Sequence, residues 1–181
     1  MKSTQKTVKL IVPFSEELTF NITGSDKDES IIRIIESNNG YYEPEIALLL
    51  SNIVKDESIC IDVGANIGAI SVIMAALAKE VHSFEPIPEN FHYLQTNIKD
   101  NNLMSCRLNN IGLFSTEKTL RFHYIEEFAG GAFYSPIGVS DPRERLVDVQ
   151  CITLDSYVEK NGLQNVDVIK MTLPRKNVFL N

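Results

Sequence analysis

The chain has 181 residues, of which 44% are hydrophobic, and this length and composition predict one domain with a sizeable core. Its formal net charge of −7 argues against proteins that bind nucleic acid or anionic membranes, since both classes favour basic surfaces. No apolar run is long enough for a membrane span, and the N-terminal MKSTQKTVKLIVPF lacks the apolar segment of a signal peptide. We therefore expect a cytoplasmic protein.

Residues 1–40 are expected to form an N-terminal extension. The segments VKLIVPF and LTFNITG predict a hairpin, and SDKDESIIRIIESNNG predicts a short helix with acidic residues and serine at its start. Residues 41–181 would form the main domain. It opens with a helix that begins at Pro44, and helical spacing predicts one apolar face made of Ile46, Leu49, Leu50 and Ile53.

A strand, helix, strand, helix succession follows. The expected elements are a strand from Ile59 to Val63, a helix from Ala65 to Ala78, a strand from Val81 to Phe84, and a helix that begins at Pro88 and carries Phe91, Leu94 and Ile98 on one face. Two such units in a row imply right-handed crossovers and parallel strands. The sequence therefore predicts a doubly wound α/β fold, with a mainly parallel sheet covered by helices on both faces.

The rhythm then changes to strand-like segments. SCRLNNIGLF, KTLRFHYI and RLVDVQCITL are expected to be strands, with EEFAGGAFYSPIGVSDP as a loop between the last two. Gly130 and Gly131 in this loop allow either a mobile lid near a substrate or a plain connection. TLDSYVEKNG predicts a short helix capped by Thr153 and Gly162, and VDVIKM predicts a further buried parallel strand.

The stretch ICIDVGANIGAISVI, which begins at Ile59, joins an apolar strand to an apolar helix through a turn with two glycines. Ligands of doubly wound sheets bind beyond the carboxyl ends of the strands. Gly64 and Gly68 permit a tight turn and close backbone approach, and the first amides of the helix can bind an anionic group. Glu85, at the end of the second strand, can accept hydrogen bonds from both hydroxyls of a ribose. Together these features predict a nucleotide-like ligand.

The letters of the turn distinguish two classes of nucleotide ligand. A dinucleotide motif would read GxGxxG, whereas Gly64, Asn66 and Ala69 occupy its three glycine positions here. The Asn66 side chain stands where a pyrophosphate would press on the backbone, which favours S-adenosylmethionine over NAD. Asp62 could meet the methionyl ammonium, directly or through water, but it would repel a pyrophosphate. An NAD-dependent oxidoreductase is the less favoured alternative, and glycines with only a packing role would leave Asp62 and Glu85 unexplained.

Five segments carry a family resemblance: YYEPE, IDVGANIG, HSFEPIPENFHYLQTNI, LDSY and VDVIKM. In this order and spacing, from Tyr41 to Met171, the chain resembles the FkbM family of S-adenosylmethionine-dependent methyltransferases. The resemblance implies the class I, Rossmann-like methyltransferase fold. It also implies O-methylation of a hydroxyl on a sugar, a glycan or another natural product.

The resemblance also implies roles for individual residues. The cofactor loop would include Asp62, Gly64, Asn66 and Gly68, with Glu85 as the ribose-binding acid. Pro86 and Ile87 would flank the adenine, and Asn110 would either reach the adenine edge or serve as a turn residue. Tyr42 and Glu43 would border the methionyl end of S-adenosylmethionine.

Other candidate groups lack a pattern that points to chemistry. His82, His92 and His123 have no partner at a catalytic spacing and are expected to be ordinary surface or strand histidines. The three cysteines, Cys60, Cys106 and Cys151, form no CxxC motif or Cys/His cluster, so no metal site is expected. Free buried thiols in a reducing compartment fit this pattern.

The family pattern breaks near the end of the sequence. After VDVIKM the family continues with Asp-x-Glu-Gly, whereas this sequence reads MTLPRKNVFLN, which contains Pro174 and no acid. We therefore expect a domain truncated after its fourth core strand, incomplete at the C-terminus, with an exposed sheet edge. No catalytic base is assigned, because the expected acids are missing. Loss of one base from a GAC codon would give Thr172, so a frameshift is one explanation.

Two functions are therefore expected. The first, which the resemblance implies, is methyl transfer from S-adenosylmethionine to a small-molecule or glycan acceptor. The break in the family pattern motivates the second. The second is a non-catalytic remnant that binds the cofactor, or a fragment that depends on a partner chain to cover its sheet edge. Neither requires nucleic acid or a membrane span.

Overall fold

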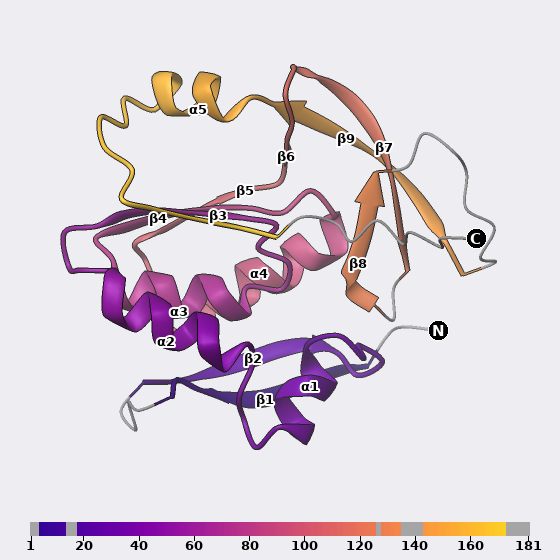
Figure 1. The fold of residues 1–181 in the computed structure, drawn as a ribbon. Coiled ribbons are helices and arrows are strands. Elements are labelled where there is room, and N and C mark those ends of the chain that lie inside the picture. The colour runs from indigo at the N-terminus through magenta and orange to yellow at the C-terminus, as the bar shows by residue number, and fades with distance from the viewer. Residues whose placement is uncertain (1–3, 14–17, 126–127, 135–142, 173–181) are drawn as a thin grey trace, which may run out of the picture.

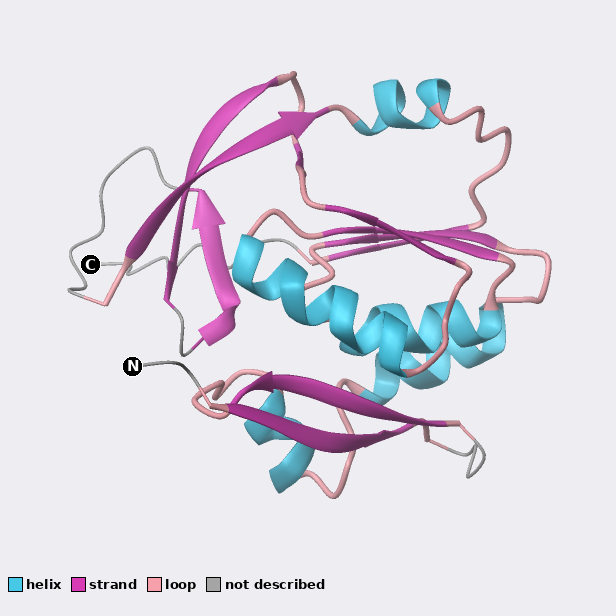
Figure 2. Ribbon diagram, turned by 180° about the vertical axis from the view of Figure 1, so that it is seen from behind, coloured by secondary structure: helices cyan, strands magenta, loops and turns pink. Residues whose placement is uncertain are grey.

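The computed structural model describes residues 4–13, 18–125, 128–134 and 143–172, with the backbone alone for 128–134. Figure 1 shows a central parallel sheet with helices on both of its faces, an N-terminal hairpin below the helices, and a further twisted sheet at one end. Figure 2 shows the same layers from behind.

The central sheet has the strand order β10-β3-β4-β5, and every neighbouring pair is parallel. Its strands are β3 (Ile59–Val63), β4 (Glu80–Phe84), β5 (Cys106–Asn109) and β10 (Val168–Met171). The strand that comes last in the sequence therefore pairs beside the first core strand. This order brings the ends of β10, β3 and β4 together at one edge of the sheet.

Helices cover both faces of this sheet, as the alternation of strands and helices predicts (Figure 1). On one face lie α2 (Pro44–Ile53), α3 (Ala69–Leu77) and α4 (Pro88–Asp100), and on the other lies α5 (Leu154–Lys160). The predicted doubly wound α/β fold is confirmed. The predicted N-cap is also present, since Thr153 Oγ1 accepts a hydrogen bond from Ser156 N at 3.0 Å.

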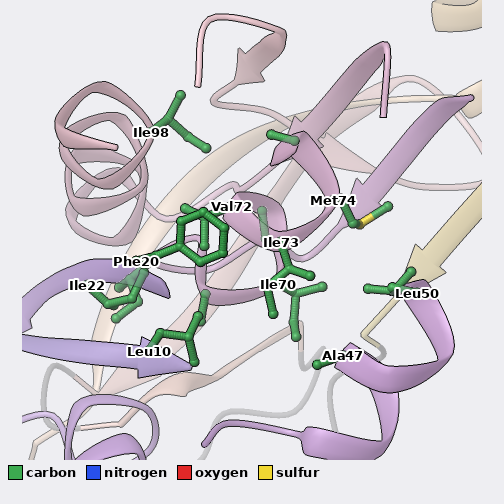
Figure 3. Packing of buried hydrophobic residues seen from close by; sticks show 14 of the residues in the cluster. Leu10, Phe20, Ile22, Ala47, Leu50, Ile70, Val72, Ile73, Met74 and Ile98 are labelled. Atoms are coloured by element: carbon green, nitrogen blue, oxygen red, sulfur yellow. The ribbon is translucent and has the colours of Figure 1, made fainter. Parts of the chain in front are cut away.

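The N-terminal segment shares its core with the main domain. The predicted hairpin consists of β1 (Gln5–Ile11) and β2 (Thr19–Ser25), and the predicted short helix is α1 (Ile32–Ser37). Figure 3 shows apolar side chains of the hairpin in one cluster with those of α2, α3 and α4. Labelled members of this cluster are Leu10, Phe20, Ile22, Ala47, Leu50, Ile70, Val72, Ile73, Met74 and Ile98.

The helix α2 buries only one residue of its predicted apolar face, Leu50, together with Ala47, which was not predicted. Ala47 and Leu50 are 1% and 3% exposed, whereas Ile46, Leu49 and Ile53 are 36%, 51% and 45% exposed. The helix carries two apolar stripes at helical spacing, and only the stripe with Ala47 and Leu50 meets the core. The remaining stripe leaves three large apolar side chains at the surface.

A separate sheet has the order β6-β9-β7-β8. Its strands are β6 (Gly112–Leu113), β7 (Lys118–Ile125), β8 (Phe128–Tyr134) and β9 (Arg145–Ile152). The segment that we expected to be a loop thus contains the strand β8, which holds Gly130 and Gly131 and pairs antiparallel with β7. Residues 135–142 of that segment lie outside the described residues.

Two further sequence expectations concern the ends and the membrane. The tail at 173–181, including Pro174, lies outside the described residues. Within the part of the chain that the structure describes, no helix is both long enough and apolar enough to cross a membrane.

Candidate functional site

The candidate site centres on residues 64–68, which connect β3 to α3 and are called the glycine loop below. The loop is tied to the carboxyl end of the neighbouring strand, because Gly64 N and Ala65 N both donate to Phe84 O, at 3.0 and 2.9 Å. It therefore lies at the sheet edge where ligands of doubly wound folds bind.

The helix after the loop begins later than predicted. We expected it to start at Ala65, but α3 begins at Ala69. The reason is the backbone of the loop: Gly64, Asn66 and Gly68 have φ angles of 74°, 56° and 93°, which are left-handed and incompatible with an α-helix. Gly68 is the N-cap of α3. Because glycine has no side chain, no side-chain hydrogen bond caps this helix.

Gly68 meets a second requirement, which is space. A Cβ atom at Gly68 would lie 2.7 Å from Leu94 Cδ1 of α4, closer than packed carbons allow. A Cβ at Gly64 would lie 3.2 Å from Thr172 O, a milder crowding. The glycines therefore serve both the turn and the packing of the elements around it.

Replacing Gly68 with alanine is expected to lower the free energy of unfolding by about 2–3 kcal/mol, the sum of left-handed strain and overpacking against Leu94. Gly162→Ala is a matched control, since Gly162 also has a positive φ, 64°, but no atom lies within 4 Å of its added Cβ. The control should lose only about 1 kcal/mol. Urea unfolding of both variants measures this difference, and equal losses would contradict the packing argument.

Glu85 follows β4 directly and binds the glycine loop through its carboxylate. Its Oε2 accepts from Asn66 N at 2.8 Å, its Oε1 accepts from Ile87 N at 2.9 Å, and the Asn90 side chain supplies a further hydrogen bond. Glu85 is only 4% exposed, so its carboxylate is buried at the end of β4 rather than open to solvent. Burial raises the pKa of Glu85 to about 7, and this effect outweighs the three hydrogen bonds that favour the ionised form.

Asn66 takes the left-handed conformation that asparagine tolerates better than other non-glycine residues. Its Oδ1 accepts from Ile67 N at 2.7 Å, while its own N–H binds Glu85. The side chain thus satisfies a loop amide locally. This arrangement explains how an asparagine stands where a dinucleotide motif requires glycine.

The other residues near Glu85 differ in their accessibility. Pro86 is partly buried, whereas Ile87 is 0% exposed and already packed. Asn110, just beyond β5, is exposed, and its Nδ2 donates to Glu85 O at 2.8 Å and to Pro86 O at 3.2 Å. These two hydrogen bonds hold the segment that follows β4.

Asp62 lies in β3, two residues before the glycine loop, and is 0% exposed. Its Oδ2 accepts from Ser71 Oγ of α3 at 2.7 Å, and Lys170 Nζ of β10 lies 2.9 Å from its Oδ1. Ser83 Oγ in turn donates to Ser71 Oγ at 2.9 Å. A buried carboxylate of this kind is compensated by a cation within the protein.

Tyr42 and Glu43 lie at the start of α2. Burial raises the pKa of Tyr42, and the negative charges of Glu43, Asp28 and Asp62 add to this effect, so the phenol is a neutral hydrogen-bonding group. Glu43 is exposed and is the N-cap of α2 with a φ of 42°. A left-handed glutamate is uncommon and often marks a functional segment.

The histidines lie apart from the glycine loop. His92 is exposed on α4, and His82 is 0% exposed in β4, where its Nδ1 lies 2.8 Å from Tyr157 Oη. Burial lowers the pKa of His82, which favours its neutral form. His123 Nδ1 lies 3.1 Å from Glu144 Oε2 in the separate sheet.

Sequence reasoning missed Lys170 and Asn90 as parts of this site. Asn90 follows Pro88 by two positions, in the first turn of α4, where a side chain can point back toward the preceding strand end. Lys170 lies in the predicted strand VDVIKM, in which a lysine among apolar residues was a signal of a buried charge partner. No group of three or more His, Cys, Asp or Glu side chains with metal-site geometry occurs among the described residues.

Comparison with protein families gives a match over more than half of the chain. A family model described as "Methyltransferase FkbM domain" matches residues 62–171, from Asp62 at the glycine loop to the end of β10. A comparison with curated proteins gives no match.

Comparison with solved structures gives partial likenesses. An rRNA methylase from Streptococcus thermophilus is 24% identical with a TM-score of 0.34, over 35% of this chain and 38% of that one. A putative methyltransferase from Streptococcus mutans in complex with SAH is 25% identical with a TM-score of 0.36, over 38% and 39%. TYW2 from M. jannaschii in complex with AdoMet is 21% identical with a TM-score of 0.41, over 60% and 44%. The chain thus spans less than half the length of each.

Proposed function

Because the chain belongs to the FkbM methyltransferase family, we propose that it binds S-adenosylmethionine at the glycine loop and transfers the methyl group to a hydroxyl of a sugar, a glycan or another natural product. The family match covers both the loop and β10. The observation that carries the proposal is the hydrogen bond of 2.8 Å between Glu85 Oε2 and Asn66 N, which joins the ribose-type acid to the glycine loop.

The residues around Glu85 fit a nucleoside. A carboxylate has about four lone-pair sites, and Asn66, Ile87 and Asn90 use three of those on Glu85. About one site is left for a ribose hydroxyl, so binding of both hydroxyls requires one of the present donors to yield. The two hydrogen bonds of Asn110 within the protein use its Nδ2, and in this proposal its Oδ1 accepts from the amino group of adenine.

Of the two apolar residues that the family motif places beside the adenine, Pro86 and Ile87, only Pro86 is accessible to the ring. Pro86 is partly exposed and can lie against a purine ring. Ile87 is completely buried, so in this proposal Pro86 rather than Ile87 touches the ring. A partly apolar wall with a polar edge is typical of nucleoside sites.

Bound here, S-adenosylmethionine would supply a methyl group on a sulfonium, open to displacement by an oxygen nucleophile. The protein's part is mainly to position the acceptor and to exclude water. The separate sheet lies beside this region, because Tyr124 Oη of β7 donates to Glu89 Oε1 in the first turn of α4 at 2.9 Å. This sheet is our candidate for the acceptor side, and a small-molecule or glycan hydroxyl is the acceptor class.

S-adenosylhomocysteine is expected to bind the wild-type chain at least about tenfold more tightly than NADH, because the Asn66 side chain crowds a pyrophosphate but not a sulfide. Isothermal titration calorimetry with each ligand measures both affinities. NADH binding with no binding of S-adenosylhomocysteine would instead favour an oxidoreductase. A methyl-transfer assay with a panel of hydroxylated acceptors then identifies the substrate.

One observation favours a second candidate, a cofactor-binding chain that works with a partner covering its sheet edge. Ile169 and Met171 of β10 are 47% and 52% exposed, and β10 pairs with β3 alone among the described strands. Exposed apolar strand edges promote association. Sedimentation velocity separates the two candidates, since a stable monomer counts against a partner-dependent chain.

A further inference from the structure

Lys170 is a charged residue at the site with no role in the proposal above. In the parallel pairing of β10 with β3, Lys170 is the direct neighbour of Asp62, one position before the end of each strand. Its ammonium lies 2.9 Å from Asp62 Oδ1 and 3.4 Å from Gly64 O. The cation is therefore placed between a buried carboxylate and the first residue of the glycine loop.

The carboxylate of Asp62 is fixed and out of reach of a ligand. Its side chain is 0% exposed, Ser71 Oγ binds its Oδ2 at 2.7 Å, and Lys170 faces its Oδ1. A methionyl ammonium could bind Asp62 Oδ1 only by displacing the ammonium of Lys170 from its largely buried position. Such a displacement is costly, because it separates a buried ion pair.

The Lys170 ammonium, in contrast, has donors to spare. It carries three N–H groups. Its approach to Asp62 Oδ1 lacks hydrogen-bond geometry, and its one hydrogen bond to a described residue is the long contact with Gly64 O. Its side chain is 15% exposed, whereas that of Asp62 is 0% exposed, so Lys170 is the more accessible member of the pair.

The charge pattern selects the group that this cation would bind. The pair of Lys170 and Asp62 is neutral overall, with the anion fully buried and the cation nearer the surface. A ligand approaching along the glycine loop therefore meets a positive group first. The methionyl part of S-adenosylmethionine offers an ammonium and a carboxylate, and only the carboxylate accepts hydrogen bonds from an ammonium.

We propose that Lys170 binds the methionyl carboxylate of the cofactor, and that Asp62 holds the Lys170 ammonium in place rather than binding the methionyl ammonium. The inference rests on the proposed function, since it assigns one end of the proposed ligand. It reverses the role that the sequence motif suggests for Asp62.

The test compares S-adenosylhomocysteine with S-adenosyl-3-thiopropylamine, which lacks the carboxylate but keeps the amine. Calorimetry should show that the wild-type chain binds S-adenosylhomocysteine about 10- to 100-fold more tightly, the effect of a charge-assisted hydrogen bond. In Lys170→Met this ratio should fall to near one, through loss of affinity for S-adenosylhomocysteine alone. An unchanged ratio in Lys170→Met overturns the inference.

Two further variants make the result decisive. Lys170→Met leaves Asp62 buried without a cation, so the double variant Asp62→Asn, Lys170→Met removes both charges and should also show a ratio near one. Lys79 lies just before β4, at the amino ends of the parallel strands, and its side chain is 61% exposed. Lys79→Met removes this cation and should keep the wild-type ratio. A loss of the ratio in Lys79→Met would point to a general charge effect and overturn the inference.

The two levels of the proposal fail in different ways. If the wild-type chain binds neither ligand, cofactor binding itself is wrong. If it binds both equally well, the cofactor site stands and the role of Lys170 is wrong.

Discussion

Replacing Glu85 with alanine is expected to lower the free energy of unfolding by about 2–4 kcal/mol and to abolish most of the affinity for S-adenosylhomocysteine. The change removes the acceptor of Asn66 N and Ile87 N, and each buried amide left without a partner costs about 1–3 kcal/mol. Part of this loss is offset, because the buried carboxylate is itself poorly solvated and its pKa is raised. The glycine loop also loses one of its links to the end of β4, while the two hydrogen bonds to Phe84 O remain.

Urea unfolding and calorimetry with S-adenosylhomocysteine measure the two effects separately. Glu85→Gln keeps one acceptor oxygen and should lie between wild type and alanine in both measurements. Glu45→Ala, an exposed position on α2, controls for the loss of a negative charge and should stay within about 0.5 kcal/mol of wild type. A Glu85→Ala variant as stable as the Glu45→Ala control would refute the role of the carboxylate in holding the loop.

The stability of the ligand-free chain is expected to fall as the pH rises from about 4.5 to about 7. Burial raises the pKa of Glu85 from 4.5 to about 7, so within this window the folded chain keeps a proton that the unfolded chain has released. A state that binds more protons is favoured at low pH, and the free energy of unfolding therefore decreases with rising pH. For this group the full change is about 3 kcal/mol, present below pH 4.5 and lost above pH 7.

The affinity for the cofactor should change with pH in the opposite direction, rising as the pH rises. In the proposed site, ribose hydroxyls would donate to the ionised carboxylate of Glu85 and lower its pKa, so binding near pH 6 should release a proton and tighten as the pH rises. Urea unfolding at several pH values and calorimetry in buffers of different ionisation enthalpy measure the two effects. Both should disappear in Glu85→Gln, and a wild-type-like pH dependence in that variant would assign them to another group.

Local sequence pattern was enough to predict the elements that carry the site. The strand Ile59–Val63 is where its apolar run indicated, and α4 begins at Pro88 as the proline predicted. Local pattern failed to predict which side chains are buried where one helix carries two apolar stripes. On α2, the spacing of Ile46, Leu49 and Ile53 is as helical as that of Ala47 and Leu50, and only tertiary packing decides which stripe is buried.

The contents of the site were predictable only in part, for a related reason. The position of Glu85 at a strand end follows from the sequence, but its burial depends on the backbone of the glycine loop, whose amide at Asn66 covers it. The partner of Asp62 could not be predicted, because the sequence does not state that β10 pairs with β3. That pairing decides whether Asp62 faces a ligand or Lys170.

The order of strands in the central sheet also sets the order in which a growing chain can complete its site. The contact of Ile59 with Asp167 spans 108 residues, so β3 leaves the ribosome long before the strand that pairs with its outer side. Until Lys170 follows, Asp62 has no cation beside it, and Gly64 has no Thr172 against it. A nascent chain can assemble the hairpin, α3 and α4, yet it still exposes one flank of β3, the kind of surface that chaperones protect. Among the four core strands, β10 is therefore the one that completes the surroundings of Asp62 and Gly64 last.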